Sequence, residues 1–213
     1  MYIFITNPNA RSGLGHKIWD DIETVLKKRG VAYQVYFTKY QQHATKIVRQ
    51  ITSDHERHNI IVLGGDGTVN EVINGIDCLA NVTLGYIPIG SSNDFARGLG
   101  LPADPLKALE NILAPVRHLA INIGVLEYGD KRRRFSVSTG LGFDAGVCHE
   151  VMVSRLKVFL NKIKLGKLSY AGVALHRMIS LDPKDMTVIM DGTRKLDFHK
   201  VYFATAMNLA YEG

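Results

Sequence analysis

The chain has 213 residues, of which 46% are hydrophobic and 22% charged, and its formal net charge is +6 at pH 7. This composition excludes an intrinsically disordered chain and is typical of a globular protein with one large core or two smaller ones. The only cysteines, Cys78 and Cys148, provide neither a disulfide framework nor the spacing of a metal site, which favours a reducing, cytoplasmic setting.

No apolar run approaches the roughly 18 residues that a membrane span needs. The first apolar segment ends at Asn7-Pro8, which makes it too short for the hydrophobic part of a signal peptide. Any contact with a membrane is therefore expected to be peripheral.

In the first half of the chain, apolar strands alternate with amphipathic helices. Strands are expected at 2–6, 33–37, 60–63 and 82–87, and helices at 16–29, 43–53 and 69–76. A last helix is predicted from Asp104, a suitable cap, through Pro105 to about Leu113. The alternation predicts an α/β domain with a doubly wound, mostly parallel sheet over residues 1–115.

The pattern changes after Pro115. Alternating residues at 119–125, a turn at Tyr128-Gly129-Asp130 and a return at 135–139 predict an antiparallel hairpin. Helices are expected at 145–165 and 168–179, and a second hairpin at 186–190 and 195–206. Asp191 in its turn is interpreted as structural. Residues 116–213 are thus expected to form a second, mainly antiparallel β domain with inserted helices.

The strand at 60–63 runs through Gly64-Gly65-Asp66-Gly67 into the next helix. Three glycines leave backbone N–H groups unshielded, and the helix directs its positive end at the loop, which suits a phosphate. The charge of Asp66 would repel a bare phosphate unless Mg²⁺ or a substrate hydroxyl lay between them. An ordinary turn is the alternative, but the loop follows a buried parallel strand, where ligands of open α/β sheets bind. It is neither a Walker loop nor a dinucleotide fingerprint.

Several segments together resemble the diacylglycerol kinase catalytic-domain family, in its bacterial lipid kinase branch. Phosphofructokinases and NAD kinases share the Gly-Gly-Asp-Gly loop, whereas the Gly-Ser-Ser-Asn-Asp-Phe-Ala segment is what resembles lipid kinases. The resemblance covers the whole chain and is carried by the stretches 7–13, Thr38 with His43-Ala44, 64–71, 88–97, 140–145 and 165–170.

The resemblance implies transfer of the γ-phosphate of ATP, with Mg²⁺, to the hydroxyl of diacylglycerol or a similar lipid. One alternative is a kinase of a soluble acceptor such as NAD. Another is an inactive nucleotide-binding fragment, because the family's later Mg²⁺-binding loop and its Asp-Gly-Glu general base have no counterpart in this sequence. A strand expected at Val201–Asn208 would end near Gly213 with an unpaired edge, so the chain is expected to be truncated.

Site residues follow from the resemblance, position by position. Asp66 is implied to be catalytic, acting on the metal or the transferred group, while the metal ligands stay unknown. Asn93 and Asp94 are expected to shape the loop or approach the acceptor, and helix capping of the segment at Phe95 is the alternative. Asp144 faces the acceptor cleft or occupies a buried turn. The implied ATP-binding residues are Asn7, Pro8, Asn9, Ala10, Arg11, Thr38, Gly65, Asp66, Gly67, Thr68, Val69, Asn70, Glu71 and Ser91.

The positive charge is concentrated late in the chain. Residues 121–213 hold 14 Lys and Arg against 9 Asp and Glu, whereas residues 1–120 hold 12 against 11. Such clusters are either solvated surface or a site for an anionic membrane leaflet carrying the lipid substrate. Nucleic acid is disfavoured because few aromatic residues are interleaved, and a homo-oligomer is left open. The clusters are Lys131–Arg134 and Arg155, Lys157, Lys162, Lys164 and Lys167.

Overall fold

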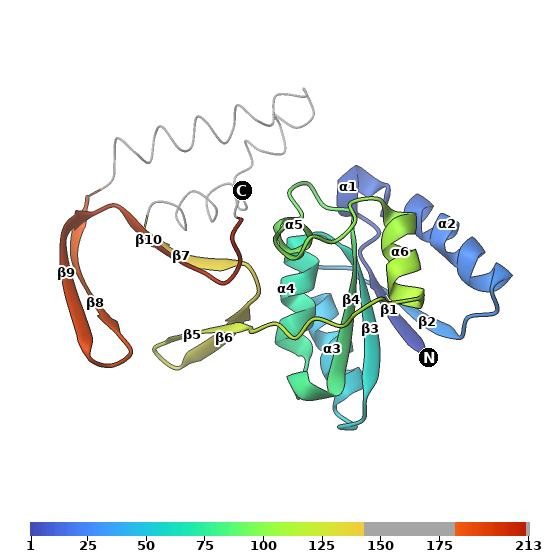
Figure 1. Cartoon of the computed structure of the whole chain (residues 1–213), viewed down its shortest axis with the longest axis horizontal. Coiled ribbons are helices and arrows are strands. Elements are labelled where there is room, and N and C mark those ends of the chain that lie inside the picture. The colour runs from blue at the N-terminus through green and yellow to red at the C-terminus, as the bar shows by residue number, and fades with distance from the viewer. Residues whose placement is uncertain (143–181, 212–213) are drawn as a thin grey trace. The chain divides into compact units, whose positions relative to one another are not determined.

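A computed structural model describes residues 1–142 and 182–211 of the chain (Figure 1). By their internal contacts the residues group into two compact units, Met1–Ser138 with Met207–Gly213, and Thr139–Ala206. This grouping places the boundary after Ser138, and the division into functional domains at residue 115 stays a prediction. Asp144 and the helices predicted at 145–165 and 168–179 lie outside the described residues.

The first unit is built on a four-stranded parallel sheet in the order β2-β1-β3-β4. Its strands are β1 (Tyr2–Thr6), β2 (Tyr33–Phe37), β3 (His58–Gly64) and β4 (Val82–Pro88). In the register, Leu63 of β3 lies opposite Thr6 of β1 and Ile87 of β4, so the carboxyl ends of these strands meet at one edge. The predicted parallel sheet is therefore confirmed.

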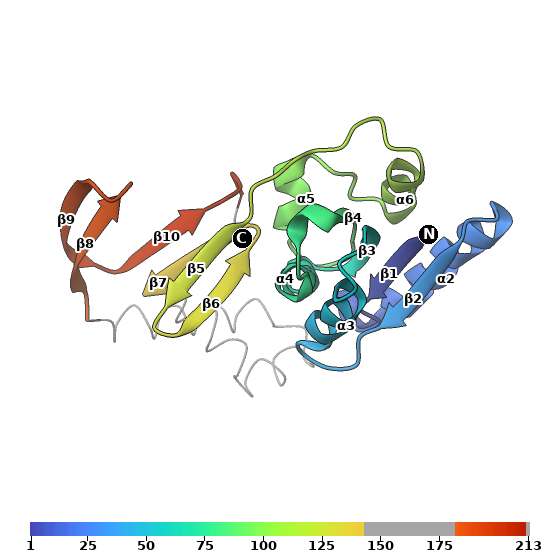
Figure 2. The same ribbon diagram turned by 90° about the horizontal axis from the view of Figure 1, so that it is seen from below.

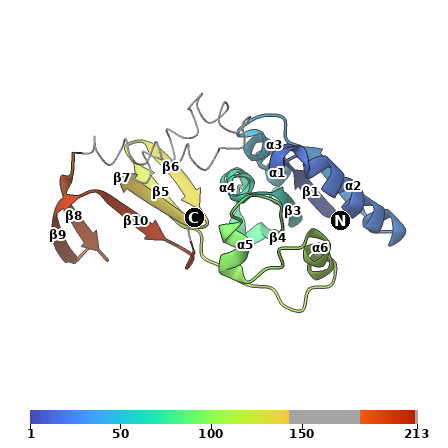
Figure 3. The same ribbon diagram turned by 90° about the horizontal axis from the view of Figure 1, so that it is seen from above.

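Helices cover both faces of this sheet (Figures 2 and 3). One core packs β1 and β3 residues such as Ile5 and Val62 against α3 and α4, and the other packs Phe4 and Ile61 against α2 and α6. Successive strand residues thus point to opposite faces, as a sheet covered on both sides requires. The helices are α1 (Ala10–Gly13), α2 (Gly15–Lys28), α3 (His43–Thr52), α4 (Asp66–Gly75), α5 (Asp94–Leu99) and α6 (Pro105–Leu113), with a 3₁₀ turn η1 at Leu79–Asn81.

Helix α6 begins as the sequence predicts. The carboxylate of Asp104 accepts a hydrogen bond of 2.9 Å from the backbone N–H of Lys107, and Pro105 is the first helical residue. This is the arrangement in which a side-chain cap and a proline both fit a helix start.

The first hairpin differs from the expectation in its boundaries. It pairs β5 (Gly124–Tyr128) with β6 (Lys131–Phe135), so the strands predicted at 119–125 and 135–139 were wrong by several residues. The chain reverses directly at Gly129, whose φ is +56°, and the basic run Lys131–Arg134 therefore forms the return strand. This hairpin belongs to the first unit, where β6 packs against α4.

In the second unit, β8 (Lys184–Met190) pairs with β9 (Arg194–Val201), and β7 (Ser138–Gly142) pairs with β10 (Phe203–Met207). Asp191, with φ of +51°, lies in the β8–β9 turn, which agrees with its structural interpretation. A strand is confirmed within the predicted range Val201–Asn208, where Phe203–Met207 forms β10, although Val201 ends β9; β10 is paired with β7 along one edge. Among the described residues, no helix combines the length and the apolarity needed to cross a membrane.

Candidate functional site

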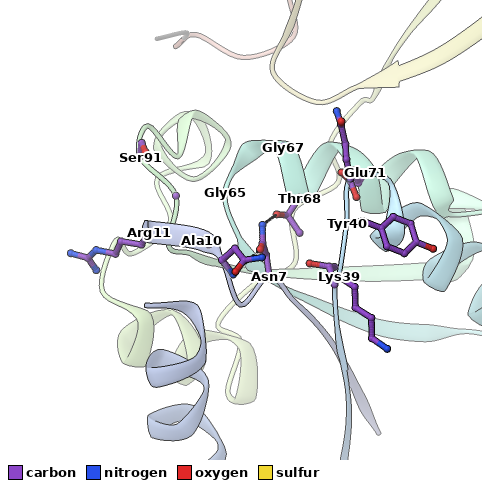
Figure 4. A pocket seen from close by; sticks show the side chains of 14 residues that line it. Asn7, Ala10, Arg11, Lys39, Tyr40, Gly65, Gly67, Thr68, Glu71 and Ser91 are labelled. Atoms are coloured by element: carbon purple, nitrogen blue, oxygen red, sulfur yellow. Dashed lines mark hydrogen bonds between the residues drawn. The ribbon is translucent and has the colours of Figure 1, made fainter. Parts of the chain in front are cut away.

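Four loops that follow the strands of the parallel sheet enclose a cleft of about 450 Å³ (Figure 4). They come after β1, β2, β3 and β4, and the third continues into the first turn of α4. The volume is in the range of small-molecule sites, about 300 to 1,000 Å³. The lining residues are Asn7, Asn9, Ala10, Arg11, Thr38, Lys39, Tyr40, Gln41, Gly65, Gly67, Thr68, Glu71, Gly90 and Ser91.

The structure brings ten of the fourteen predicted nucleotide-site residues together around this cleft. The other four do not line it; they are Pro8, Asp66, Val69 and Asn70. Val69, a residue of α4, is fully buried in the core. The role of all fourteen in nucleotide binding stays a prediction. Sequence reasoning missed Lys39, Tyr40, Gln41 and Gly90, although the first three directly follow a predicted strand, where ligands of such sheets bind.

The glycines around the cleft differ in whether the structure leaves room for a side chain. A side-chain carbon on Gly90 would lie 2.6 Å from the Cα atom of Gly65, and one on Gly64 would lie 2.6 Å from the side chain of Thr68. The loops after β3 and β4 also share a hydrogen bond of 2.8 Å from the Ile89 N–H to the Gly64 carbonyl. A carbon on Gly67, by contrast, would meet no atom within 4 Å. The fold thus requires Gly64 and Gly90 to lack side chains, whereas Gly67 leaves open space in the cleft.

The first turn of α4 presents hydrogen-bond donors at this open space. The N–H groups of Thr68 and Val69 donate to the Gly65 carbonyl at 2.9 and 3.1 Å. Those of Asp66 and Gly67 donate to no acceptor among the described residues. Free N–H groups and the positive end of a helix favour an anion, so this end of the cleft suits a phosphate.

Asp66 connects the two loops that carry the sequence motifs. Its carboxylate accepts hydrogen bonds from the backbone N–H groups of Asp94 at 3.1 Å and Phe95 at 3.0 Å. These are the first residues of α5, so Asp66 provides that helix with its N-terminal cap. A catalytic role for Asp66 stays a prediction; the contact seen is structural.

Asn93 shapes the loop before α5 instead of capping the helix. Its backbone is left-handed, with φ of +55°. Its side chain accepts from the Gly90 N–H at 2.8 Å and donates to the Gly90 carbonyl at 3.1 Å. The loop-shaping alternative is thus what the contacts show, whereas contact of Asn93 or Asp94 with an acceptor stays a prediction.

The hydroxyl of Tyr86 lies beneath both loops. It is within hydrogen-bond distance of the Gly64 carbonyl, at 3.3 Å, and of Asn93 Oδ1, at 3.2 Å. Burial raises the pKa of Tyr86 far above its usual range, and the negative charges of Asp66 and Asp94 raise it further. The phenol therefore stays protonated and acts as a fixed donor.

The charged residues lining the cleft are Arg11, Lys39 and Glu71. Glu71 already accepts the Ala44 N–H at 3.3 Å, at the start of α3. The cleft therefore offers excess positive charge to an anion. No group of three His, Cys, Asp or Glu side chains that could hold a metal occurs in the described part of the chain.

Comparison with known proteins gives the family. The description "Diacylglycerol kinase catalytic domain" matches residues 1–124, which include every lining residue of the cleft. The chain belongs to the diacylglycerol kinase catalytic-domain family. The resemblance of the motifs at 64–71 and 88–97 is thereby confirmed.

Individual relatives agree with this assignment. Over 190 residues the chain is 38% identical to a diacylglycerol kinase of Bacillus subtilis, covering 88% of this chain and 59% of that protein. It is 29% identical over 218 residues to YtlR of the same organism, which is named as a lipid kinase by provisional assignment. That match covers 100% of this chain and 70% of YtlR. A crystal structure of a diacylglycerol kinase from Bacillus anthracis strain Sterne matches with a TM-score of 0.68 and 26% identity. That match covers 99% of this chain and 64% of the Bacillus anthracis chain. The chain thus spans between 59% and 70% of the lengths of these three proteins.

Proposed function

We propose that this protein is an ATP-dependent lipid kinase, which transfers the γ-phosphoryl group of ATP to the hydroxyl of diacylglycerol or a similar lipid. The observation that carries the proposal is the convergence of the two family motifs on one cleft, joined by the Asp66 carboxylate and the Gly65–Gly90 contact. The choice of a lipid as the acceptor is supported by the similar proteins, which are named as diacylglycerol or lipid kinases.

The cleft can orient a nucleotide without covalent chemistry, as phosphoryl transfer mainly demands. The N–H groups of Asp66 and Gly67 would bind phosphate oxygens, and the absent side chain of Gly67 would let them approach. Thr68 and Ser91 would donate hydroxyl hydrogen bonds, and Arg11 and Lys39 would offset phosphate charge. A divalent metal would arrive with the ATP phosphates, as Mg²⁺ usually does in phosphoryl transfer.

The acceptor is proposed to be presented at an anionic membrane surface by peripheral contact in the cytoplasm. The basic hairpin strand β6 supports this part of the proposal. Lys131, Arg132 and Arg133 are exposed, whereas Arg134 is turned inward and donates to the Ile73 carbonyl of α4 at 3.0 Å. Lys131 and Arg133 are therefore available to anionic lipid, whereas Arg132 is paired with Glu127 at 3.1 Å.

Labelled ATP offered to the full-length protein tests the proposal. The assay includes vesicles carrying diacylglycerol, vesicles carrying a sphingoid base, and soluble NAD as a competing acceptor. We expect label in a lipid and none in NAD. Label in NAD alone, or binding of ATP without transfer to any lipid, would overturn the proposal.

A further inference from the structure

The chain that leaves β10 packs back against α5 of the first unit. The N–H groups of Asn208 and Leu209 both donate to the Val137 carbonyl, at 2.7 and 3.2 Å, and the Asn208 side chain donates to the Ser136 carbonyl at 3.0 Å. Leu209 lies so close to α5 that a side-chain carbon on Gly98 would stand 3.0 Å from its Cβ atom. Residues 208–211 are thus anchored beside α5, the helix that contains the end of the second family motif.

This segment places an aromatic ring on an arginine of α5. The guanidinium carbon of Arg97 lies 5.0 Å from the ring centroid of Tyr211, a distance at which a cation is attracted to the ring face. The same guanidinium pairs with the Asp94 carboxylate, with Nη2 2.6 Å from Oδ1. The Arg97 side chain is 47% exposed and that of Asp94 only 11%. Tyr211 therefore contributes to holding the Arg97 side chain in contact with an almost buried carboxylate.

Asp94 needs such a partner because a second carboxylate is close by. Its own N–H donates to Asp66, and the charges of both residues act on the Tyr86 hydroxyl. Two like charges in a partly buried site repel one another, which favours displacement of one of the two side chains. The Arg97 guanidinium offsets this repulsion, and its planar donors set the direction of the Asp94 carboxylate.

We infer that Arg97, held by the ring of Tyr211, is a positioning residue that sets the Asp94 carboxylate beside the cleft for phosphoryl transfer. The inference rests on the proposed function. Asp94 is not among the residues lining the cleft, so loss of either partner is expected to lower turnover and leave ATP affinity unchanged.

Three variants of the full-length enzyme test this inference: Arg97→Met, Tyr211→Leu and Tyr211→Phe. We expect the first two to lower kcat by about tenfold to a hundredfold, the range in which misplacing a reacting group costs rate. Tyr211→Phe keeps the ring and should keep the parental kcat. ATP affinity, measured by titration, should be unchanged in all three.

A matched control separates positioning from loss of stability. Arg29→Met removes the ion pair of Arg29 with Glu110, whose side chains are 46% and 49% exposed, between α2 and α6. That variant should keep the parental kcat. The inference is overturned if Tyr211→Leu turns over at the parental rate, if Tyr211→Phe is as slow as Tyr211→Leu, or if Arg29→Met is equally slow.

Amide hydrogen exchange of residues 94 and 95 adds a readout that does not depend on activity. Exchange should be faster in Tyr211→Leu than in Tyr211→Phe, because the loosened Arg97 no longer steadies the start of α5. A parent enzyme that phosphorylates no lipid would refute the proposed function alone. Equal exchange in the two Tyr211 variants would then refute the positioning role as well.

Discussion

The carboxylate of Asp66 and the backbone N–H of Phe95 are joined by a hydrogen bond of 3.0 Å across 29 positions of the sequence. The bond ties the loop after β3 to the helix after β4, and both loops border the same cleft. Asp66 therefore has a structural role beside the catalytic role predicted for it, and substitutions must be chosen to separate the two.

Asp66→Asn removes the charge and keeps one of the two oxygens that accept from α5, while its amide NH2 group replaces the other acceptor. We expect the variant to stay folded at a cost of about 1 to 3 kcal/mol, because one N–H group at the start of α5 loses its acceptor. Turnover should fall about a hundredfold or more, from a loss of roughly 2.7 to 4 kcal/mol of electrostatic stabilisation in the barrier. Steady-state assays and thermal unfolding of the full-length enzyme measure the two effects.

Asp104→Asn is the matched control, since Asp104 caps α6 through Lys107 and does not line the cleft. It should leave turnover unchanged. Parental turnover in folded Asp66→Asn would show that Asp66 is only a helix cap.

Alanine at Gly67 and at Gly90 should have opposite consequences. Gly90→Ala forces its new carbon against the Gly65 backbone, and we expect a loss of about 1 to 3 kcal/mol in the free energy of unfolding, as for other overpacked sites. Gly67→Ala meets no atom and replaces a helical glycine, so stability should be kept or rise by up to about 1 kcal/mol. Its methyl group nevertheless enters the cleft, and ATP affinity should fall at least about tenfold.

Urea unfolding and ATP titration decide between these outcomes. Unchanged ATP affinity in stable Gly67→Ala would mean that phosphate does not approach the first turn of α4.

Two neighbouring arginines of β6, Arg133 and Arg134, should have different roles, one in membrane binding and the other in stability. Arg133→Gln is expected to weaken binding to anionic vesicles by about fivefold, because one basic side chain near such a surface contributes about 1 kcal/mol. Arg134→Gln should instead lower the free energy of unfolding, since the Arg134 guanidinium donates to the Ile73, Ile76 and Asp77 carbonyls at the end of α4.

Sedimentation with anionic and neutral vesicles at two salt concentrations measures the first effect, and urea unfolding the second. Binding that is equal for both kinds of vesicle and unaffected by salt would identify β6 as ordinary solvated surface.

Tyr86 should make stability depend on pH in the alkaline range. Its pKa is raised in the folded protein above the ordinary value of 10.0, so the phenol stays protonated there while the unfolded chain ionises. The contribution is complete below about pH 10 and is lost as pH rises toward the folded pKa, by up to about 1.4 kcal/mol per pH unit.

Tyr86→Phe removes this one ionisable group and leaves the other tyrosines in place. The difference in unfolding free energy between parent and variant should therefore shrink steadily between pH 10 and 11.5, measured by urea unfolding. A difference that stays constant over this range would show that Tyr86 ionises equally in the folded and unfolded states.

The first unit was largely predictable because its signals are local. The continuous apolar run of β3 and the pair Asp104-Pro105 each mark an element without reference to distant residues. The partners of Asp66 were not predictable, since Asp94 and Phe95 approach only after the sheet has formed. The return strand β6 was misplaced because consecutive charges at Arg132 and Arg133 hide the alternation by which strands are recognised.

The side-chain amide of Asn74, on α4, pairs with the backbone of Arg134 as a neighbouring strand would. It accepts the Arg134 N–H and donates to the Arg134 carbonyl, both at 2.9 Å. A two-stranded ribbon alone specifies its register weakly, and a slip of one residue turns each side chain to the opposite face. Because side chains alternate along a strand, holding Arg134 against α4 leaves the neighbouring Arg133 on the opposite face of the hairpin. A residue outside the hairpin thus helps to orient the basic surface.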